Sequence, residues 1–167
     1  MTDAAPPNAT TVLVTGASSG IGAATARLLA ERGHRVFGAS RSPATIPGVD
    51  AIRMDVRDED AVAAGVGEVL ARGRRLDALV CCAGLGVFGS VEETSLARAR
   101  AQLETNYFGT LLPVRAVLPG MRARGAGRIV VVGSLAGRAP IPFQAHYSAS
   151  KAALDALVLS LRNELHG

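Results

Sequence analysis

Short apolar runs alternate with longer segments of helical periodicity along the chain. The compact apolar runs, which we expect to form strands, cover residues 11–16, 35–40, 50–56, 76–84 and 127–134. The segments of helical period cover residues 20–33, 58–73, 94–121 and 145–165. Pro113 is expected to bend the third of these helices. Alternating strands and helices predict an α/β fold, a doubly wound Rossmann-like parallel sheet with helices on both faces.

The length and composition fit one globular domain. The chain has 167 residues, of which 49% are hydrophobic and 19% charged, and this balance argues against disorder. We expect residues 1–10 to form a flexible lead-in and 11–167 to form the single domain. The lead-in has no basic and apolar pattern of a signal peptide, and no apolar run is long enough to span a membrane.

Charge and cysteine usage narrow the classes of partner. The formal net charge is +4, but the arginines are scattered and aromatic residues make up only 4%. A nucleic-acid surface needs a concentrated basic stripe, so we expect attraction for a small anionic ligand and no nucleic-acid partner. Cys81 and Cys82 are adjacent, which disfavours a disulfide between them and favours reduced thiols in a cytoplasmic protein. No His/Cys cluster has metal-binding spacing, so no metal is expected.

A glycine-rich turn, "TGASSGIG" at 15–22, follows the first strand and opens the first helix. Its glycines are Gly16, Gly20 and Gly22, and its hydroxyl groups are those of Ser18 and Ser19. The first glycine permits a tight turn, the second leaves room for a diphosphate, and the third lets helix and sheet pack closely. Free N–H groups at the helix start then attract phosphate. A glycine-rich turn without a ligand is the alternative, but the strand–turn–helix context favours nucleotide binding.

The end of the second strand bears on which nucleotide is bound. Ser40 stands where an acidic residue would favour NAD(H), and Arg41 follows it. A guanidinium there can grip a 2′-phosphate, so we prefer NADP(H) while NAD(H) remains possible. A solvated loop arginine is the alternative reading of Arg41. Asp55, after the third strand, could accept the adenine amino group or cap a turn.

Tyr147 and Lys151 lie four residues apart in the last expected helix, so they share one face. The ammonium group of this single lysine would stabilise a phenolate, which suits Tyr147 to general acid–base chemistry on a carbonyl oxygen. Ser134, at the end of the fifth strand, could hold the same oxygen, and Asn106 could anchor a water that feeds protons to Lys151. Each residue alone would more often make local hydrogen bonds, so their ordered combination carries the hypothesis.

Taken together, these motifs resemble the short-chain dehydrogenase/reductase family. "TGASSGIG" is similar to the family's cofactor motif, and Asn106, Ser134, Tyr147 and Lys151 are similar to its catalytic tetrad in order. The resemblance implies hydride transfer between NAD(P)(H) and an alcohol/carbonyl pair, and a homo-oligomer. The implied cofactor contacts also include Tyr147 and Lys151, together with Ile21, Val56, Ala83 and Gly84.

The chain departs from the family pattern in two places. Cys81 and Cys82 replace two asparagines that usually tie neighbouring backbone together. The sequence also ends at residue 167, at the end of the Tyr/Lys helix, whereas family members continue through two more strands and a substrate-covering segment. We therefore expect the fifth strand to be an open sheet edge. A nucleotide-binding module without catalysis, or an inactive fragment, is the alternative to an enzyme.

Two apolar loops give the only indication of a substrate. Their apolar side chains are Leu85, Val87, Phe88, Ile141, Pro142 and Phe143. These side chains could line a hydrophobic pocket or pack as ordinary loop residues. The pattern is similar to the hydroxysteroid- and retinol-dehydrogenase-like branch of the family, which implies a lipophilic ketone or aldehyde as substrate.

Overall fold

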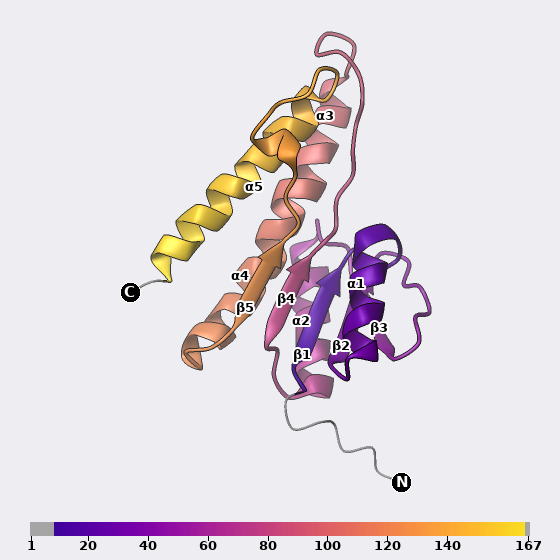
Figure 1. The fold of residues 1–167 in the computed structure, drawn as a ribbon, viewed down its shortest axis with the longest axis vertical. Helices are drawn as coiled ribbons and strands as arrows, with labels where there is room; N and C mark the ends of the chain where they lie inside the picture. The colour runs from indigo at the N-terminus through magenta and orange to yellow at the C-terminus, as the bar shows by residue number, and fades with distance from the viewer. Residues whose placement is uncertain (1–8, 166–167) are drawn as a thin grey trace.

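The computed structural model describes residues 9–165 and contains a five-stranded parallel sheet (Figure 1). The strand order is β3-β2-β1-β4-β5, and every neighbouring pair is parallel. The strands are β1 Thr11–Thr15, β2 Arg35–Ser40, β3 Val49–Arg53, β4 Ala78–Cys81 and β5 Arg128–Val131. The expected fold class and all five expected strands are therefore confirmed, although several strands are shorter than the apolar runs that predicted them.

Within residues 9–165, five α-helices connect and extend these strands. They are α1 Gly20–Glu31, α2 Glu59–Gly73, α3 Leu96–Leu103, α4 Gly109–Ala123 and α5 Ala145–Glu164. The Asp58 side chain caps α2 by accepting a 3.0 Å hydrogen bond from the Ala61 N–H, which satisfies one of the free donors at the helix start. A 3₁₀ turn, Leu135–Gly137, follows β5.

The long helix expected over 94–121 is interrupted before Pro113, and the bend expected at Pro113 itself stays a prediction. α4 continues through Pro113, and the interruption is a π-helical turn at Glu104–Phe108. In that turn the N–H of Gly109 donates to the carbonyl of Glu104, five residues earlier. A proline disturbs the helix on its N-terminal side because its ring crowds the carbonyl four residues before it. The wider π turn lies on that side of Pro113.

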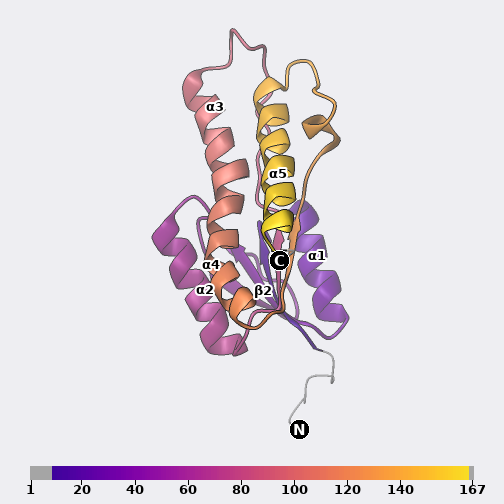
Figure 2. The same cartoon turned by 90° about the vertical axis from the view of Figure 1, so that its left-hand side faces the viewer.

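The sheet separates two apolar cores. On one face Leu13 packs in the cluster that includes Val66 of α2 and Val117 of α4. On the other face Val12 and Val14 pack in the cluster that includes Ala26 of α1. Figure 2 shows α2 and α4 on one side of the sheet and α1 on the other. Both faces of β1 are covered, which explains why this strand reads as a continuous apolar run.

Among the described residues, β5 pairs with β4 alone and forms one edge of the sheet, as expected from the sequence. α5 lies beside the α3–α4 column (Figure 2). Between α4, β5 and α5 lies an apolar cavity of about 620 Å³, whose lining includes Leu118, Ile129 and Leu161. Leu159, farther along α5, is 58% exposed. The apolar face of α5 is thus only partly covered by the described chain.

Candidate active site

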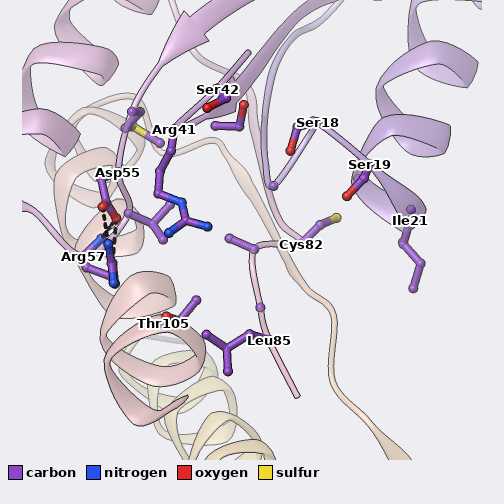
Figure 3. A pocket seen from close by; sticks show the side chains of 18 residues that line it. Ser18, Ser19, Ile21, Arg41, Ser42, Asp55, Arg57, Cys82, Leu85 and Thr105 are labelled. Carbon is purple, nitrogen blue, oxygen red and sulfur yellow. Dashed lines mark hydrogen bonds and ion pairs between the residues drawn. The ribbon is translucent and has the colours of Figure 1, made fainter. Parts of the chain in front are cut away.

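A cavity of about 650 Å³ opens at the carboxyl ends of the strands (Figure 3). This is where parallel α/β sheets bind ligands, because the loops there diverge at a change of strand order. The residues predicted to bind cofactor that line this cavity are Gly16, Ser18, Ser19, Gly20, Ile21, Gly22, Ser40, Arg41, Asp55, Val56, Ala83 and Gly84. One cavity therefore gathers residues that the sequence spreads over 69 positions, from Gly16 to Gly84.

The three glycines of the turn differ in what a side chain would meet. A Cβ at Gly16 would lie 2.7 Å from the Cα of Ala83, and a Cβ at Gly22 would overlap the carbonyl oxygen of Gly16. At Gly20, whose φ is +53°, a Cβ would meet nothing within 4 Å. Gly16 and Gly22 therefore allow the chain to pack against itself, whereas Gly20 leaves open space beside the start of α1. This cradle fits a diphosphate.

The hydroxyl of Ser40 at the end of β2 is a buried polar atom with no hydrogen-bond partner among the described residues. Arg41, next in the chain, is exposed and extends beside the cavity (Figure 3). Buried polar groups in proteins are nearly always paired, so this hydroxyl indicates a position for a polar ligand group. Together with the open space at Gly20, this fits the dinucleotide that the glycine motif implies.

Asp55 is held by Arg57, a residue that the sequence reasoning did not single out. Its carboxylate accepts hydrogen bonds from the Arg57 Nε (3.0 Å) and Nη2 (2.6 Å), and also from the Arg57 backbone N–H (3.0 Å). The side-chain hydrogen bond of Arg57 lowers the pKa of Asp55 from 3.8 to about 2. The carboxylate therefore caps a turn, one of its two expected roles, and a contact with adenine stays a prediction.

Thr15 holds the segment at the end of β4, where Cys81 and Cys82 stand in place of the asparagines usual in the similar family. Its hydroxyl oxygen accepts hydrogen bonds from the N–H groups of Cys82 (3.2 Å) and Ala83 (3.3 Å). The Cys82 side chain points into the cavity (Figure 3). Burial raises the pKa of this thiol, and the positive charge of Lys151 opposes that rise. Cys82 therefore connects the glycine-turn cavity with the region around Lys151.

Tyr147 and Lys151 face one another in the first turns of α5. The Nζ of Lys151 lies 5.8 Å from the centroid of the Tyr147 ring, over its face. The same ammonium donates a 2.8 Å hydrogen bond to the carbonyl oxygen of Val132, just beyond β5. Lys151 is 6% exposed, and this burial lowers its pKa from 10.5. The two side chains thus form the pair that their spacing predicted.

The loop after β5 carries Ser134 and presses against the helix of this pair. The Ser134 hydroxyl accepts a 3.2 Å hydrogen bond from the N–H of Ala136, so it caps the 3₁₀ turn. At the end of that turn, a Cβ on Gly137 would lie 2.9 Å from the carbonyl carbon of Lys151. Gly137 therefore allows the loop to touch the backbone of α5, a role that sequence reasoning missed.

Asn106 lies in the π-helical turn and is fully buried. Its Oδ1 accepts a 2.8 Å hydrogen bond from the N–H of Leu85, and its Nδ2 donates to the Leu85 carbonyl and to the Ser150 hydroxyl, each at 3.0 Å. Its own carbonyl accepts from Thr110 Oγ1 at 2.9 Å. The side chain therefore joins the loop after β4 to α5, while the expected water relay to Lys151 stays a prediction.

The cavity does not enclose every predicted site residue. Asn106, Ser134, Tyr147 and Lys151 lie outside its lining, around α5 and the end of β5. The cavity also has lining residues that the cofactor prediction lacked, namely Ser42, Met54, Arg57, Cys82, Leu85 and Thr105. Ser42 and Arg57 could have been found because they stand within two residues of Arg41 and Asp55. Thr105 could not, because only the fold brings the π-helical turn to this position.

The parallel sheet, the glycine cradle and the strand-end cavity define a dinucleotide-binding protein of the Rossmann type. The family model described as short chain dehydrogenase matches residues 10–167. The chain belongs to the short-chain dehydrogenase family of oxidoreductases, and membership implies a nicotinamide dinucleotide as cofactor.

Several relatives are similar over most of this chain. A 3-ketodihydrosphingosine reductase of Bacteroides thetaiotaomicron is 38% identical over 156 residues, covering 93% of this chain and 58% of the relative. The human 17-beta-hydroxysteroid dehydrogenase type 1 is 40% identical over 170 residues, covering 91% and 51%. The crystal structure of a short-chain dehydrogenase from Streptomyces avermitilis has a TM-score of 0.90 and 37% identity, covering 96% of this chain and 62% of that one.

The chain spans about half to three fifths of the length of these relatives. None of the helices within residues 9–165 is long and apolar enough to cross a membrane.

Proposed function

We propose that the chain binds NADP(H) and belongs to an enzyme that transfers a hydride between this cofactor and a lipophilic alcohol/carbonyl pair. The observation that carries the proposal is the facing pair of Tyr147 and Lys151, whose Nζ lies 5.8 Å from the tyrosine ring. When bound, the nicotinamide supplies or accepts the hydride.

The residues of the chain would handle the proton and the orientation of the substrate. Tyr147 would donate a proton from its phenol to the substrate oxygen during reduction and would take it back during oxidation. Lys151 would stabilise the resulting phenolate by its charge, held in place by the Val132 carbonyl. Ser134 would donate a hydrogen bond to the same oxygen, because its contact with Ala136 uses only an acceptor site of the hydroxyl.

The preference for NADP(H) is supported by the end of β2. Ser40 offers an unpaired hydroxyl, Arg41 an exposed guanidinium and Ser42 a second hydroxyl beside the cavity. A guanidinium binds a phosphate through two parallel hydrogen bonds, which an acidic residue at this place would prevent. The hydrogen bonds to the Asp55 carboxylate come from Arg57, and Arg41 acts on that carboxylate by its charge alone, which also lowers the pKa of Asp55.

The proposed substrate class is supported by two apolar loops near Tyr147. The N–H of Gly89 donates a 2.9 Å hydrogen bond to the carbonyl of Phe143, so the two loops lie side by side. Phe88 is 64% exposed and Phe143 is 69% exposed. Exposed aromatic side chains on adjoining loops suit an apolar ligand. The names of two relatives, a ketodihydrosphingosine reductase and a hydroxysteroid dehydrogenase, describe lipophilic substrates of those proteins.

Replacement of Tyr147 by Phe tests this function. The variant keeps the ring but loses the hydroxyl, so turnover of a steroid or long-chain ketone with NADPH should fall by about 10²- to 10⁴-fold. Its dissociation constant for NADPH, measured by fluorescence titration, should stay within about twofold, because the cavity lining does not include Tyr147. Unchanged turnover would reject the mechanism.

A nucleotide-binding module without catalysis is the second candidate. It is favoured by the partly uncovered apolar face of α5. NADPH binding without oxidation by any carbonyl in the screen would support it. We also propose that the protein forms a homo-oligomer. We further propose that it works in the reducing cytoplasm, because Cys81 and Cys82 are free thiols.

A further inference from the structure

Two buried amide side chains from the column of α3 and the π turn hold the loop that follows β4. The Oδ1 of Asn106 accepts a 2.8 Å hydrogen bond from the N–H of Leu85. The Oε1 of Gln102, one turn earlier, accepts a 2.8 Å hydrogen bond from the N–H of Val87. Both amide residues are 0% exposed, so each binds the loop by the same kind of contact.

The amide nitrogens of Asn106 and Gln102 differ in their hydrogen-bond partners. The Nδ2 of Asn106 donates a 3.0 Å hydrogen bond to the Ser150 hydroxyl on α5. The Nε2 of Gln102 is buried and has no hydrogen-bond partner among the described residues. The Nε2 of His146, on the first turn of α5, is a second buried nitrogen without a partner in that part of the chain. Two orphaned polar atoms thus belong to neighbouring elements.

The register of the helices brings these two atoms to the same level. The column of α3 and α4 runs beside α5 in the same direction (Figures 1 and 2). Asn106 and Ser150, which are hydrogen-bonded, are 44 positions apart. Val114 and Val158, with the same spacing, line the cavity between α4 and α5. Gln102 and His146 have the same spacing of 44 positions, one turn before the contact of Asn106 with Ser150, so the register places them at the same level.

We propose that Gln102 and His146 form a second polar rung between these helices, parallel to the rung of Asn106 and Ser150. The amide nitrogen of Gln102 can only donate, and no direct hydrogen bond joins it to His146 among the described residues. In the proposed rung one buried water accepts from Gln102 and donates to the Nε2 of His146. That arrangement puts the ring proton on Nδ1. The rung ties the loop at Val87 to the helix turn that carries Tyr147.

Gln102 and His146 are therefore positioning residues, which act on Tyr147 through the first turn of α5. The existence of the rung is independent of any reaction. Only the effect of the rung on proton transfer rests on the proposed function, so the rung and the proposed function can be rejected independently.

The tautomer of His146 tests the rung without turnover. In ¹⁵N–¹H correlation spectra of the intact chain, His146 should show a protonated Nδ1 and an acceptor Nε2, and Gln102→Met should convert it to a mixture of tautomers. His34, whose Nδ1 lies 2.9 Å from the Thr10 hydroxyl, is the internal control and should not change. A proton on Nε2 of His146 in the wild-type chain, or no response to Gln102→Met, would overturn the proposal.

A double-mutant cycle gives an independent measurement. Gln102→Met and His146→Leu should each lower the urea midpoint of unfolding. The midpoint of the double variant should be no lower than that of the less stable single variant, because the same rung is lost in all three proteins. Additive losses would overturn the rung. In an active protein, Gln102→Met should lower kcat several-fold without changing NADPH binding, and His146→Gln should retain most of the wild-type kcat because it keeps an acceptor.

Discussion

The ammonium group of Lys151 donates a 2.8 Å hydrogen bond to the carbonyl oxygen of Val132, which joins α5 to the end of the edge strand β5. The contact holds a 6% exposed lysine in one position, with its Nζ over the ring of Tyr147. Gly137, in the loop that follows β5, lies against the backbone of Lys151. The geometry of the candidate catalytic pair therefore depends on β5 as much as on the helical spacing of four residues.

The burial of Lys151 predicts a dependence of stability on pH. Its pKa in the folded chain is below 10.5, so the unfolded chain binds more protons as pH approaches that value. The contribution of Lys151 to stability should therefore rise with pH through its folded pKa and level off above 10.5. Lys151→Met lacks this titration. The difference in urea unfolding free energy, wild type minus variant, should be larger at pH 10 than at pH 7; an equal or smaller difference would contradict the prediction.

Arg41 should discriminate between the two nicotinamide cofactors. Arg41→Ala removes a charged hydrogen-bond donor worth about 1.5–3 kcal/mol, so NADPH should bind roughly 10- to 100-fold more weakly. NADH has no 2′-phosphate, and its affinity should change by less than about twofold. Isothermal titration of both cofactors measures the ratio. Arg53→Ala is the matched control, because Arg53 is exposed at the end of β3 and does not line the cavity. Equal losses for NADPH and NADH would contradict a phosphate contact.

Alanine substitutions at two glycines of the turn should affect stability and cofactor binding to different extents. Gly22→Ala forces a Cβ into the carbonyl of Gly16, so it should destabilise the fold by about 1–3 kcal/mol. At Gly20 a Cβ meets nothing within 4 Å, and the cost is the strain at φ +53°, about 1–2 kcal/mol. Because that Cβ enters the phosphate cradle, Gly20→Ala should weaken NADPH binding at least tenfold in chain that remains folded. Urea unfolding and cofactor titration check the two variants, and normal binding by Gly20→Ala would place the diphosphate elsewhere.

The order of strands and helices was predictable because local patterns carry it. β1 is apolar at three of its five positions, and Gly20 and Gly22 open α1, so the strand–turn–helix unit is readable from about twenty residues. The interruption of the long helix was not predicted. Pro113 is the visible helix breaker, but the π turn around Asn106 also depends on tertiary contacts with Leu85 and Ser150.

The candidate site was predictable where residues stand in a motif and unpredictable where the fold brings them together. Arg57 holds Asp55 from two residues away, yet which of the two expected roles the carboxylate takes depends on the turn geometry. Cys82, just after β4, and Lys151, on α5, are 69 positions apart in the sequence, and only the fold brings them close enough for the lysine charge to affect the thiol. Gly137 and Gln102 have no motif at all, and their roles follow only from the neighbours they touch.

Cys82 offers a chemical probe of the cavity. Its thiol lines the cavity and its pKa is raised by burial, so at pH 8 it should react with iodoacetamide more slowly than a free cysteine does. Saturating NADPH should slow this reaction at least fivefold, because the cofactor would cover the thiol. Cys81 is buried with its pKa raised to about 12 and should react only on unfolding. Mass spectrometry of tryptic peptides follows both residues, and Cys82→Ser should remove all labelling of the folded chain. Equal rates with and without NADPH would show that the cofactor does not occupy this cavity.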